Sequence, residues 1–297
     1  MHISRKQFIK GTLATALGLG VIPKLYSRTI HQDSIPAKRI LGNTGIEVTT
    51  LGFGATRTQE PGVVKAAIQS KMNFLDTGRR YAKGQNEVMI GKVLKGIRKQ
   101  YVIQSKMKVR LKDGSATAAE IRKQMEKSLE ESLKALQTDY IDIMLLHGID
   151  NPEWLKHETI RQVFSEMKAR GVIRACGFSS HENHVNMLHE ANTDHFYDVV
   201  MIPFNPFGGF KHSQVDWSTS WDQQALIKAM KQAHQNGTGL VAMKTCSGGG
   251  YAYQKEGKPS FPGAVSWVRS QSFVDTTAVA MASYKEISEH TRESGFS

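Results

Sequence analysis

Short apolar runs recur along the chain from about Arg39 onward, and turn residues bound each of them. Each run has the length of a β-strand that is buried on both faces, as in a parallel sheet. The runs are Thr50–Gly54, Asn73–Leu75, Tyr101–Ser105, Ile141–Leu146, Ile173–Phe178, Val199–Ile202, Leu240–Met243 and Thr276–Ala280. The pattern therefore predicts eight strands.

Longer segments between these runs have the spacing of amphipathic helices. In ATAAEIRKQMEKSLEESLKAL, residues 116–136, the apolar positions are Ile121, Met125, Leu129, Leu133 and Leu136. In HETIRQVFSEMKARG, residues 157–171, the apolar positions are Ile160, Val163, Phe164 and Met167, and Gly171 ends the pattern. Strands that alternate with helices require a parallel sheet with right-handed crossovers. Eight such units in roughly 260 residues match the size of an α/β fold of the (β/α)8 TIM-barrel type.

A doubly wound dinucleotide-binding sheet is the competing architecture. Its fingerprint needs three spaced glycines directly after a strand. The segment GFGATR supplies Gly52 and Gly54 but has Arg57 at the third place. The barrel is therefore favoured, and the preceding segment KRILGNTGIEVTT predicts an N-terminal β-hairpin, turned at residues 43–45, that plugs the base of the barrel.

The N-terminal segment has the layout of an export signal. MHISRKQFIK is basic, GTLATALGLGVI is weakly apolar and too short to span a bilayer, and Pro23 follows. SRKQFIK resembles the twin-arginine export motif, with Lys6 in place of the second arginine. We expect residues 1–32 to be a signal and residues 33–297 to be the barrel of a protein exported to the periplasm or cell envelope. The alternative is an amphipathic tail on a cytoplasmic protein.

The charge of the chain changes this picture little. Of the net charge of +12, residues 1–28 contribute five cations and no acid, which leaves +7 on the remainder. No Lys/Arg run interleaved with aromatic residues stands out there, so no nucleic-acid partner is predicted. A mildly basic body would suit an anionic cofactor or substrate. Arg79 and Arg80 either meet such a substrate or lie solvated in a loop.

Cysteines and histidines add no metal or disulfide chemistry. Cys176 and Cys246 are too few for a disulfide framework and are expected to be small packing residues. The segment HENHVNMLHEANTDH offers four histidines, but no acid or cysteine completes a ligand set at helical spacing. We therefore predict no metal site.

Four polar residues fall at or just after the carboxyl ends of predicted strands, where barrel enzymes carry their catalytic groups: Asp76, Tyr81, Lys106 and His147. Each alone has an ordinary interpretation as a surface or capping residue. Together they form an acid site, because a nearby ammonium lowers the pKa of a phenol, which can then give a proton to a carbonyl oxygen. Asp76 would hold the lysine, and His147 would orient the carbonyl. The set lacks a nucleophile–base pair and metal ligands, so hydride must come from a cofactor.

Three segments around these residues resemble the aldo-keto reductase family: NFLDTGRRYAKGQNEVMIGKVLKG, VIQSKM and LQTDYIDIMLLHGID. The resemblance runs from about Lys38 to about residue 290. It implies that the four residues are a catalytic tetrad in which Tyr81 is the general acid. It also implies NADPH as cofactor, with NADH possible, and an aldehyde, ketone or sugar-like carbonyl as the small-molecule substrate.

The cofactor segments resemble the family less completely. GVIRACGFSSHE carries Ser179–Ser180 where the family has a Ser-Asn pair for the nicotinamide amide. VVMIPFNPF carries Met201 and Phe204 where the family has an amide-binding Gln and a ring-stacking Tyr. LVAMKTCSGGG resembles the loop that wraps the pyrophosphate, with Lys244 available as a cation. The cofactor contacts implied are Gly54, Ala55, Arg57, Ser179, Ser180, Phe204, Lys244, Thr245, Ser247 and Gly248.

Two function classes remain open. The first is an NAD(P)H-dependent carbonyl reductase. The second is a non-catalytic barrel that binds a nucleotide or a partner. The altered amide pocket would suit this class, as would a C-terminal loop that we expect to be short or missing. The intact tetrad favours the first class, since a binding module has no need of Lys106 beside Tyr81. The sequence does not indicate the oligomeric state.

Overall fold

The computed structural model describes residues 37–110, 116–211, 216–246 and 261–292. The chain separates into two units, Met1–Gln32 and Asp33–Ser297, and every described residue belongs to the second. The predicted export signal therefore lies outside the described residues. Among the described residues, no helix is both long and apolar enough to cross a bilayer.

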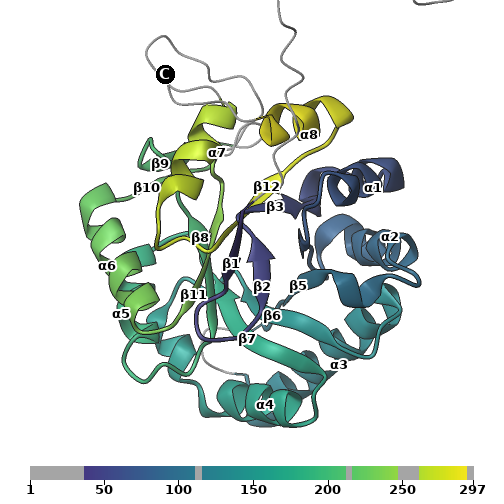
Figure 1. Ribbon diagram of the computed structural model, residues 1–297. Coiled ribbons are helices and arrows are strands. Elements are labelled where there is room, and N and C mark those ends of the chain that lie inside the picture. The colour runs from purple at the N-terminus through teal and green to yellow at the C-terminus, as the bar shows by residue number, and fades with distance from the viewer. Residues whose placement is uncertain (1–36, 111–115, 212–215, 247–260, 293–297) are drawn as a thin grey trace, which may run out of the picture. The chain divides into compact units, whose positions relative to one another are not determined.

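A closed barrel of eight parallel strands forms the centre of the described unit (Figure 1). Its strands follow one another in the order β11-β12-β3-β4-β5-β6-β7-β8. They are β3 (Leu51–Gly54), β4 (Phe74–Asp76), β5 (Val102–Met107), β6 (Ile141–His147), β7 (Ile173–Ser179), β8 (Val199–Pro203), β11 (Gly239–Met243) and β12 (Thr276–Ala280). Each overlaps one of the apolar runs, with ends that differ by up to two residues, so the predicted TIM barrel is confirmed.

Helices surround the barrel (Figure 1). The α-helices are α1 (Pro61–Gln69), α2 (Gln85–Val93), α3 (Ala118–Leu136), α4 (Glu158–Ala169), α5 (His184–Ala191), α6 (Gln223–Gln235), α7 (Phe261–Ser270) and α8 (Tyr284–Thr291). Short 3-10 helices are η1 (Ala55–Arg57), η2 (Tyr81–Gly84), η3 (Arg98–Gln100) and η5 (Pro152–Lys156). Helix α3 shows how the sequence sets these elements, because Thr117 and Glu120 form a capping box at its start. Its periodic apolar positions are buried, with the exception of a partly buried Leu133.

The predicted N-terminal hairpin closes the amino-terminal end of the barrel. It consists of the antiparallel strands β1 (Lys38–Ile40) and β2 (Glu47–Thr49). Its apolar side chains, Leu41, Ile46 and Val48, pack in one cluster with the inward-facing residues of the barrel. Arg39 ties the hairpin to the far end of the chain, since its Nη1 donates to the carbonyl oxygen of Gln271 at 2.9 Å.

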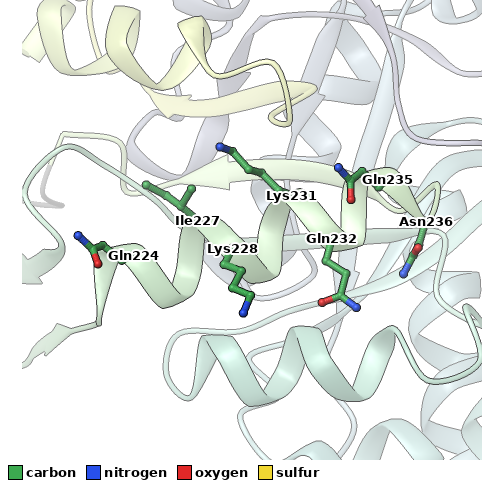
Figure 2. Close-up of a pocket in the computed structure, with 7 residues that line it drawn as sticks. All are labelled: Gln224, Ile227, Lys228, Lys231, Gln232, Gln235 and Asn236. Carbon is green, nitrogen blue, oxygen red and sulfur yellow. The ribbon is translucent and has the colours of Figure 1, made fainter.

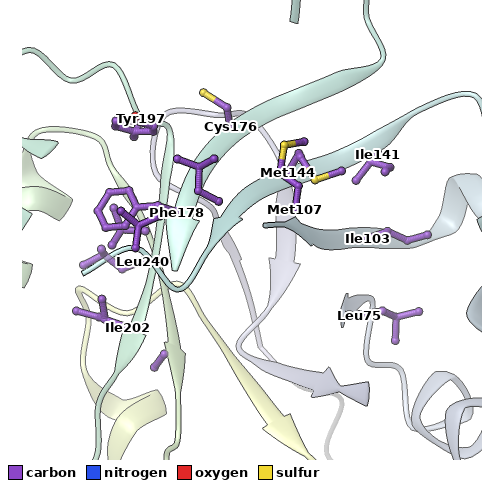
Figure 3. Packing of buried hydrophobic residues seen from close by; sticks show 14 of the residues in the cluster. Leu75, Ile103, Met107, Ile141, Met144, Cys176, Phe178, Tyr197, Ile202 and Leu240 are labelled. Carbon is purple, nitrogen blue, oxygen red and sulfur yellow. The ribbon is translucent and has the colours of Figure 1, made fainter. Parts of the chain in front are cut away.

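Side chains of each barrel strand alternate between the interior and the helices. The interior cluster contains, among others, Phe74, Val102, Ile143, Leu145 and Met201. Outward-facing residues such as Met144, Cys176, Phe178 and Ile202 belong to a separate cluster beneath the helices (Figure 3). Because the period of a strand is two, this alternation decides which residues at the strand ends can reach the barrel mouth.

A second hairpin, which the sequence pattern did not predict, follows β8. Its strands are β9 (Gly209–Lys211) and β10 (Ser218–Ser220). The buried side chain of Asn205 donates to the carbonyl oxygens of Gly209 and Lys244, each at 3.0 Å. The hairpin is therefore fixed to the carboxyl end of β11.

Candidate active site

Three of the four predicted catalytic residues point into the barrel at its carboxyl end. Asp76 ends β4, Lys106 lies one residue before the end of β5, and His147 ends β6. Each is separated by an even number of residues from a side chain of the interior cluster, namely Phe74, Val102 and Leu145 respectively. The strand period thus brings together three residues that are far apart in the sequence.

Lys106 is the centre of the cluster and is 1% exposed. Its Nζ donates to Asp76 Oδ1 at 2.5 Å, to the carbonyl oxygen of Thr77 at 2.7 Å and to Tyr81 Oη at 3.0 Å. An ammonium group has three hydrogens, so these three acceptors use its full donor capacity. Because Tyr81 Oη accepts from Lys106, the phenolic hydrogen of Tyr81 stays available for an acceptor outside this group.

The loop that carries Tyr81 is held by buried polar contacts. Asn86 Nδ2 donates to the carbonyl oxygens of Ala55 and Thr58, both at 2.9 Å. Arg79 forms an ion pair with the fully buried Glu87, which also accepts from Ser105 Oγ at 2.6 Å. Arg79 therefore positions the loop, although the sequence had suggested a contact with substrate or solvent.

The pKa of Tyr81 lies above its ordinary value, because burial of the phenol outweighs the neighbouring ammonium of Lys106, which lowers it. The sequence-based expectation of a net lowering is wrong in this structure, since it counted the cation and left out the cost of placing phenolate away from water. The consequence suits an acid. Tyr81 keeps its proton at neutral pH, so the proton is present when a carbonyl oxygen needs it.

His147 completes the cluster as a neutral imidazole. Its ring meets the ring of Tyr81 edge to face, with centroids 5.7 Å apart and planes at 82°. Burial, followed by the charge of Lys106, lowers the pKa of His147 to about 3. A neutral imidazole retains one N–H donor, which can bind the same oxygen that receives the proton of Tyr81.

The sequence profile of the Aldo/keto reductase family matches residues 52–295, which include all four of these residues. The chain belongs to the aldo/keto reductase family.

Individual relatives of this aldo/keto reductase are more distant. An L-galactose dehydrogenase of Arabidopsis thaliana is 33% identical over 156 residues, which are 48% of this chain and 47% of the relative. The chain therefore spans about half the length of the curated relatives that it matches.

Solved structures of aldo-keto reductases share the fold over most of the chain. The holo form of aldo-keto reductase AKR11C1 from Bacillus halodurans has a TM-score of 0.66 and 23% identity, covering 86% of this chain and 90% of that one. A Klebsiella pneumoniae aldo/keto reductase in complex with NADP and acetate has a TM-score of 0.62 and 20% identity, covering 85% of this chain and 88% of that one.

One residue of this aldo/keto reductase site, Gln104, was missed by the sequence reasoning. Its side chain is 0% exposed, and its Nε2 donates to Asp76 Oδ1 at 2.7 Å, the same oxygen that accepts from Lys106. Met201 Sδ lies 3.3 Å from the same nitrogen. Gln104 stands two residues before Lys106, so the strand period could have placed it in the barrel interior.

The first group of predicted cofactor residues lies at the carboxyl end of β3. Gly54 approaches the backbone of β12 so closely that a Cβ atom there would lie 3.2 Å from the carbonyl oxygen of Ala278. Ala55 is fully buried. Arg57 is near the surface, with its side chain 43% exposed and its Nη2 3.6 Å from Glu286 Oε1 on α8.

The predicted serine pair lies at the carboxyl end of β7, beside His147. Ser179 Oγ accepts from the backbone N–H of Gly148 at 3.0 Å. Ser180 Oγ donates to Asp150 Oδ1 at 2.8 Å. The Ser180 hydroxyl is therefore already engaged within the protein.

Phe204 is not brought to the site. It follows β8 on the outward side of the strand alternation, in the cluster that contains Ile202. Its ring packs against Trp267 of α7 and Phe273, with centroids 5.2 Å and 5.8 Å away. The structure thus gives Phe204 a packing position beneath the helices, away from the inward-facing tetrad.

The third group follows β11. Thr245 is buried, and Ser247 and Gly248 lie outside the described residues. Lys244 extends toward the tetrad, with its Nζ 2.7 Å from His181 Nδ1. The ring of His181 lies 6.4 Å from that of His147, measured between centroids.

Two other features of the described residues do not compete with this site. A hollow on the outer surface is lined by residues of α6 and its C-cap alone, which are Gln224, Ile227, Lys228, Lys231, Gln232, Gln235 and Asn236 (Figure 2). It contains no acid–base constellation. Within the described ranges, no three His, Cys, Asp or Glu side chains lie close enough together to hold a metal ion.

Proposed function

We propose that this aldo/keto reductase is an NAD(P)H-dependent oxidoreductase that reduces the carbonyl group of an aldehyde, ketone or sugar-like substrate to an alcohol. The observation that carries the proposal is the hydrogen bond that Lys106 Nζ donates to Tyr81 Oη at 3.0 Å, because it leaves the phenol its own proton to give to an acceptor other than Lys106. A site with an acid and no nucleophile needs a hydride donor, and a nicotinamide cofactor supplies hydride when it is bound.

Each residue of the tetrad has a different role in the proton transfer. His147 binds and orients the carbonyl oxygen of the substrate. Tyr81 gives its proton to that oxygen as negative charge develops on it, and Lys106 then stabilises the phenolate through the hydrogen bond already present at 3.0 Å. Asp76 and Gln104 hold Lys106 in place from within the barrel.

The rim of the barrel fits a cofactor with phosphate groups. Arg57 presents a partly exposed guanidinium at the end of β3. The Klebsiella pneumoniae structure described above contains NADP, which supports NADPH as the cofactor here, with NADH possible. The L-galactose dehydrogenase among the relatives supports a substrate of the sugar-like class.

Titration of the protein with NADPH and NADH, followed by intrinsic tryptophan fluorescence, tests the proposal. We expect saturable binding of NADPH, and then oxidation of NADPH at 340 nm when aldehydes, ketones and sugar-like carbonyls are supplied. Binding of nucleotide with no turnover on any of these carbonyls would instead support the non-catalytic barrel. Absence of nucleotide binding would contradict the reductase and would leave the barrel that binds a partner.

We further propose that residues 1–32 direct the protein to the periplasm or cell envelope. The basic segment, the weakly apolar segment and the twin-arginine-like SRKQFIK support this proposal. A reporter fused to residues 1–32 should be exported, and Arg5→Lys should reduce export, because it removes the single arginine of the motif. Lys10→Arg, which leaves that arginine in place, is the matched control. A reporter that remains in the cytoplasm would favour the amphipathic tail.

A further inference from the structure

Lys244 has an unusual backbone conformation at the end of β11. Its φ angle is +53°, in the left-handed region that non-glycine residues rarely adopt. The hydrogen bond from Asn205 to its carbonyl oxygen, at 3.0 Å, holds this conformation. Left-handed residues other than glycine cluster at functional sites, where the surrounding structure enforces them.

The side chain of Lys244 is enclosed by aromatic rings. Its Nζ lies 4.3 Å from the ring centroid of Phe210 on β9 and 4.2 Å from that of Trp217, which directly precedes β10. Its hydrogen-bond partner among the described residues is His181 Nδ1. The ring of His181 in turn neighbours the ring of His147, so the ammonium lies beside the place where a carbonyl would react.

No carboxylate of the described residues lies within ion-pair distance of Lys244. The acids that act on it from further away are Asp150 and Glu182. Asp150 Oδ1 already accepts from Ser180 Oγ and from two backbone N–H groups, at 2.8, 2.6 and 3.0 Å. Glu182 accepts from the indole of Trp217 at 3.2 Å. Both acids thus have other hydrogen-bond partners, and among the described residues the ammonium of Lys244 is hydrogen-bonded to His181 alone.

We propose that Lys244 binds a carboxylate group of the substrate, so that this enzyme prefers aldehydes or ketones that also carry an acid group. This inference rests on the proposed carbonyl reduction. A partly desolvated ammonium gains from a charged oxygen acceptor, since charge-assisted hydrogen bonds are about twice as strong as neutral ones. A phosphate of the cofactor has the same chemistry, but the contact with His181 places the ammonium beside His147, which favours the substrate.

The protonation of Lys244 gives the preference a pH dependence. Burial lowers the pKa of Lys244 to about 7, and the acids Asp150 and Glu182 oppose that shift. The pKa of His181, which faces it directly, is lowered to about 4 by burial, so His181 stays neutral above that value. The preference for acids should therefore be largest near pH 6 and should fade toward pH 9 as Lys244 loses its proton.

Matched pairs of substrates test the proposal: 4-oxobutanoate, 5-oxopentanoate and 4-formylbenzoate, each compared with its methyl ester. The readout is the ratio of kcat/KM for the acid to kcat/KM for the ester, which cancels any general loss of activity. In Lys244→Met this ratio should fall by about tenfold or more for at least one pair, the scale of a hydrogen bond to a charged group. Lys244→Arg should retain the ratio, as should the control Lys211→Met, which removes an exposed cation from β9.

The same compounds are also titrated by tryptophan fluorescence, for which Trp217 is a nearby reporter and no turnover is needed. If the wild type binds an acid more tightly than its ester and Lys244→Met loses this difference, the result supports the site, whether or not the compounds are reduced. If the wild type reduces none of the compounds, that result counts against the proposed function and not against the site. Unchanged ratios in both assays would overturn the inference. Unchanged ratios together with weakened NADPH binding would overturn it by assigning Lys244 to a cofactor phosphate.

Discussion

Tyr81→Phe is expected to lower kcat by about 10²-fold or more, the scale of a lost general acid. The substitution removes one oxygen and keeps the ring that meets His147 edge to face. Because Tyr81 accepts a hydrogen bond from Lys106 and offers its own proton outward, the loss should fall on the chemical step. Steady-state kinetics at saturating NADPH measure it, and NADPH affinity should change little.

Tyr284→Phe is the matched control, since Tyr284 lies on α8 with 62% of its surface exposed. It makes the same chemical change far from the inward-facing tetrad and should leave kcat as it is. Turnover in Tyr81→Phe equal to that of the wild type would mean that another group supplies the proton.

Lys106→Met is expected to abolish turnover and also to destabilise the fold. The variant leaves Asp76 buried without its ion partner, and breaking a buried pair from one side costs about 3–5 kcal/mol. Of the side-chain hydrogen bonds that the described residues make to that carboxylate, the one from Gln104 would remain. The midpoint of urea unfolding measures the effect on stability, and single-turnover kinetics measure the effect on chemistry.

The double variant Asp76→Asn/Lys106→Met separates these two effects. Removing both charges should recover much of the lost stability, because no unpaired charge is left in the barrel, whereas turnover should stay as low as in Lys106→Met. A single Lys106→Met variant that unfolds at the same urea concentration as the wild type would contradict the buried ion pair.

Most of the fold could be predicted because buried strands and amphipathic helices leave strong periodic patterns. The exact ends of the strands were harder to predict, because a charged residue can lie inside a buried strand when it is paired. The run Tyr101–Ser105 became β5 (Val102–Met107), since the charge of Lys106 is neutralised by Asp76 and so does not end the buried strand. The second hairpin was missed because its strands, GFK and STS, are three residues long and mostly small or polar.

The candidate site was harder to predict, because it depends on direction and environment. The sequence placed Asp76, Lys106 and His147 at strand ends, and the strand period turns all three inward. The same period turns Phe204 outward, which the family resemblance alone did not reveal. The direction in which the pKa of Tyr81 shifts depends on how deeply the phenol is buried. The contacts of Lys244 depend on Trp217 in the second hairpin, which is distant from Lys244 in the sequence. Neither can be predicted from the residues next to them in the chain.

The hairpin that closes the barrel has a consequence for biosynthesis. Arg39 bonds to the carbonyl oxygen of Gln271, 232 residues later, and β3 pairs with β12. The first described elements to leave the ribosome therefore complete their contacts only after the last strand of the barrel has been made. Until nearly the whole chain has been made, β3 has an unpaired edge and the apolar side chains of the hairpin have no interior to fill, so we expect nascent chains to depend on chaperones for protection from aggregation.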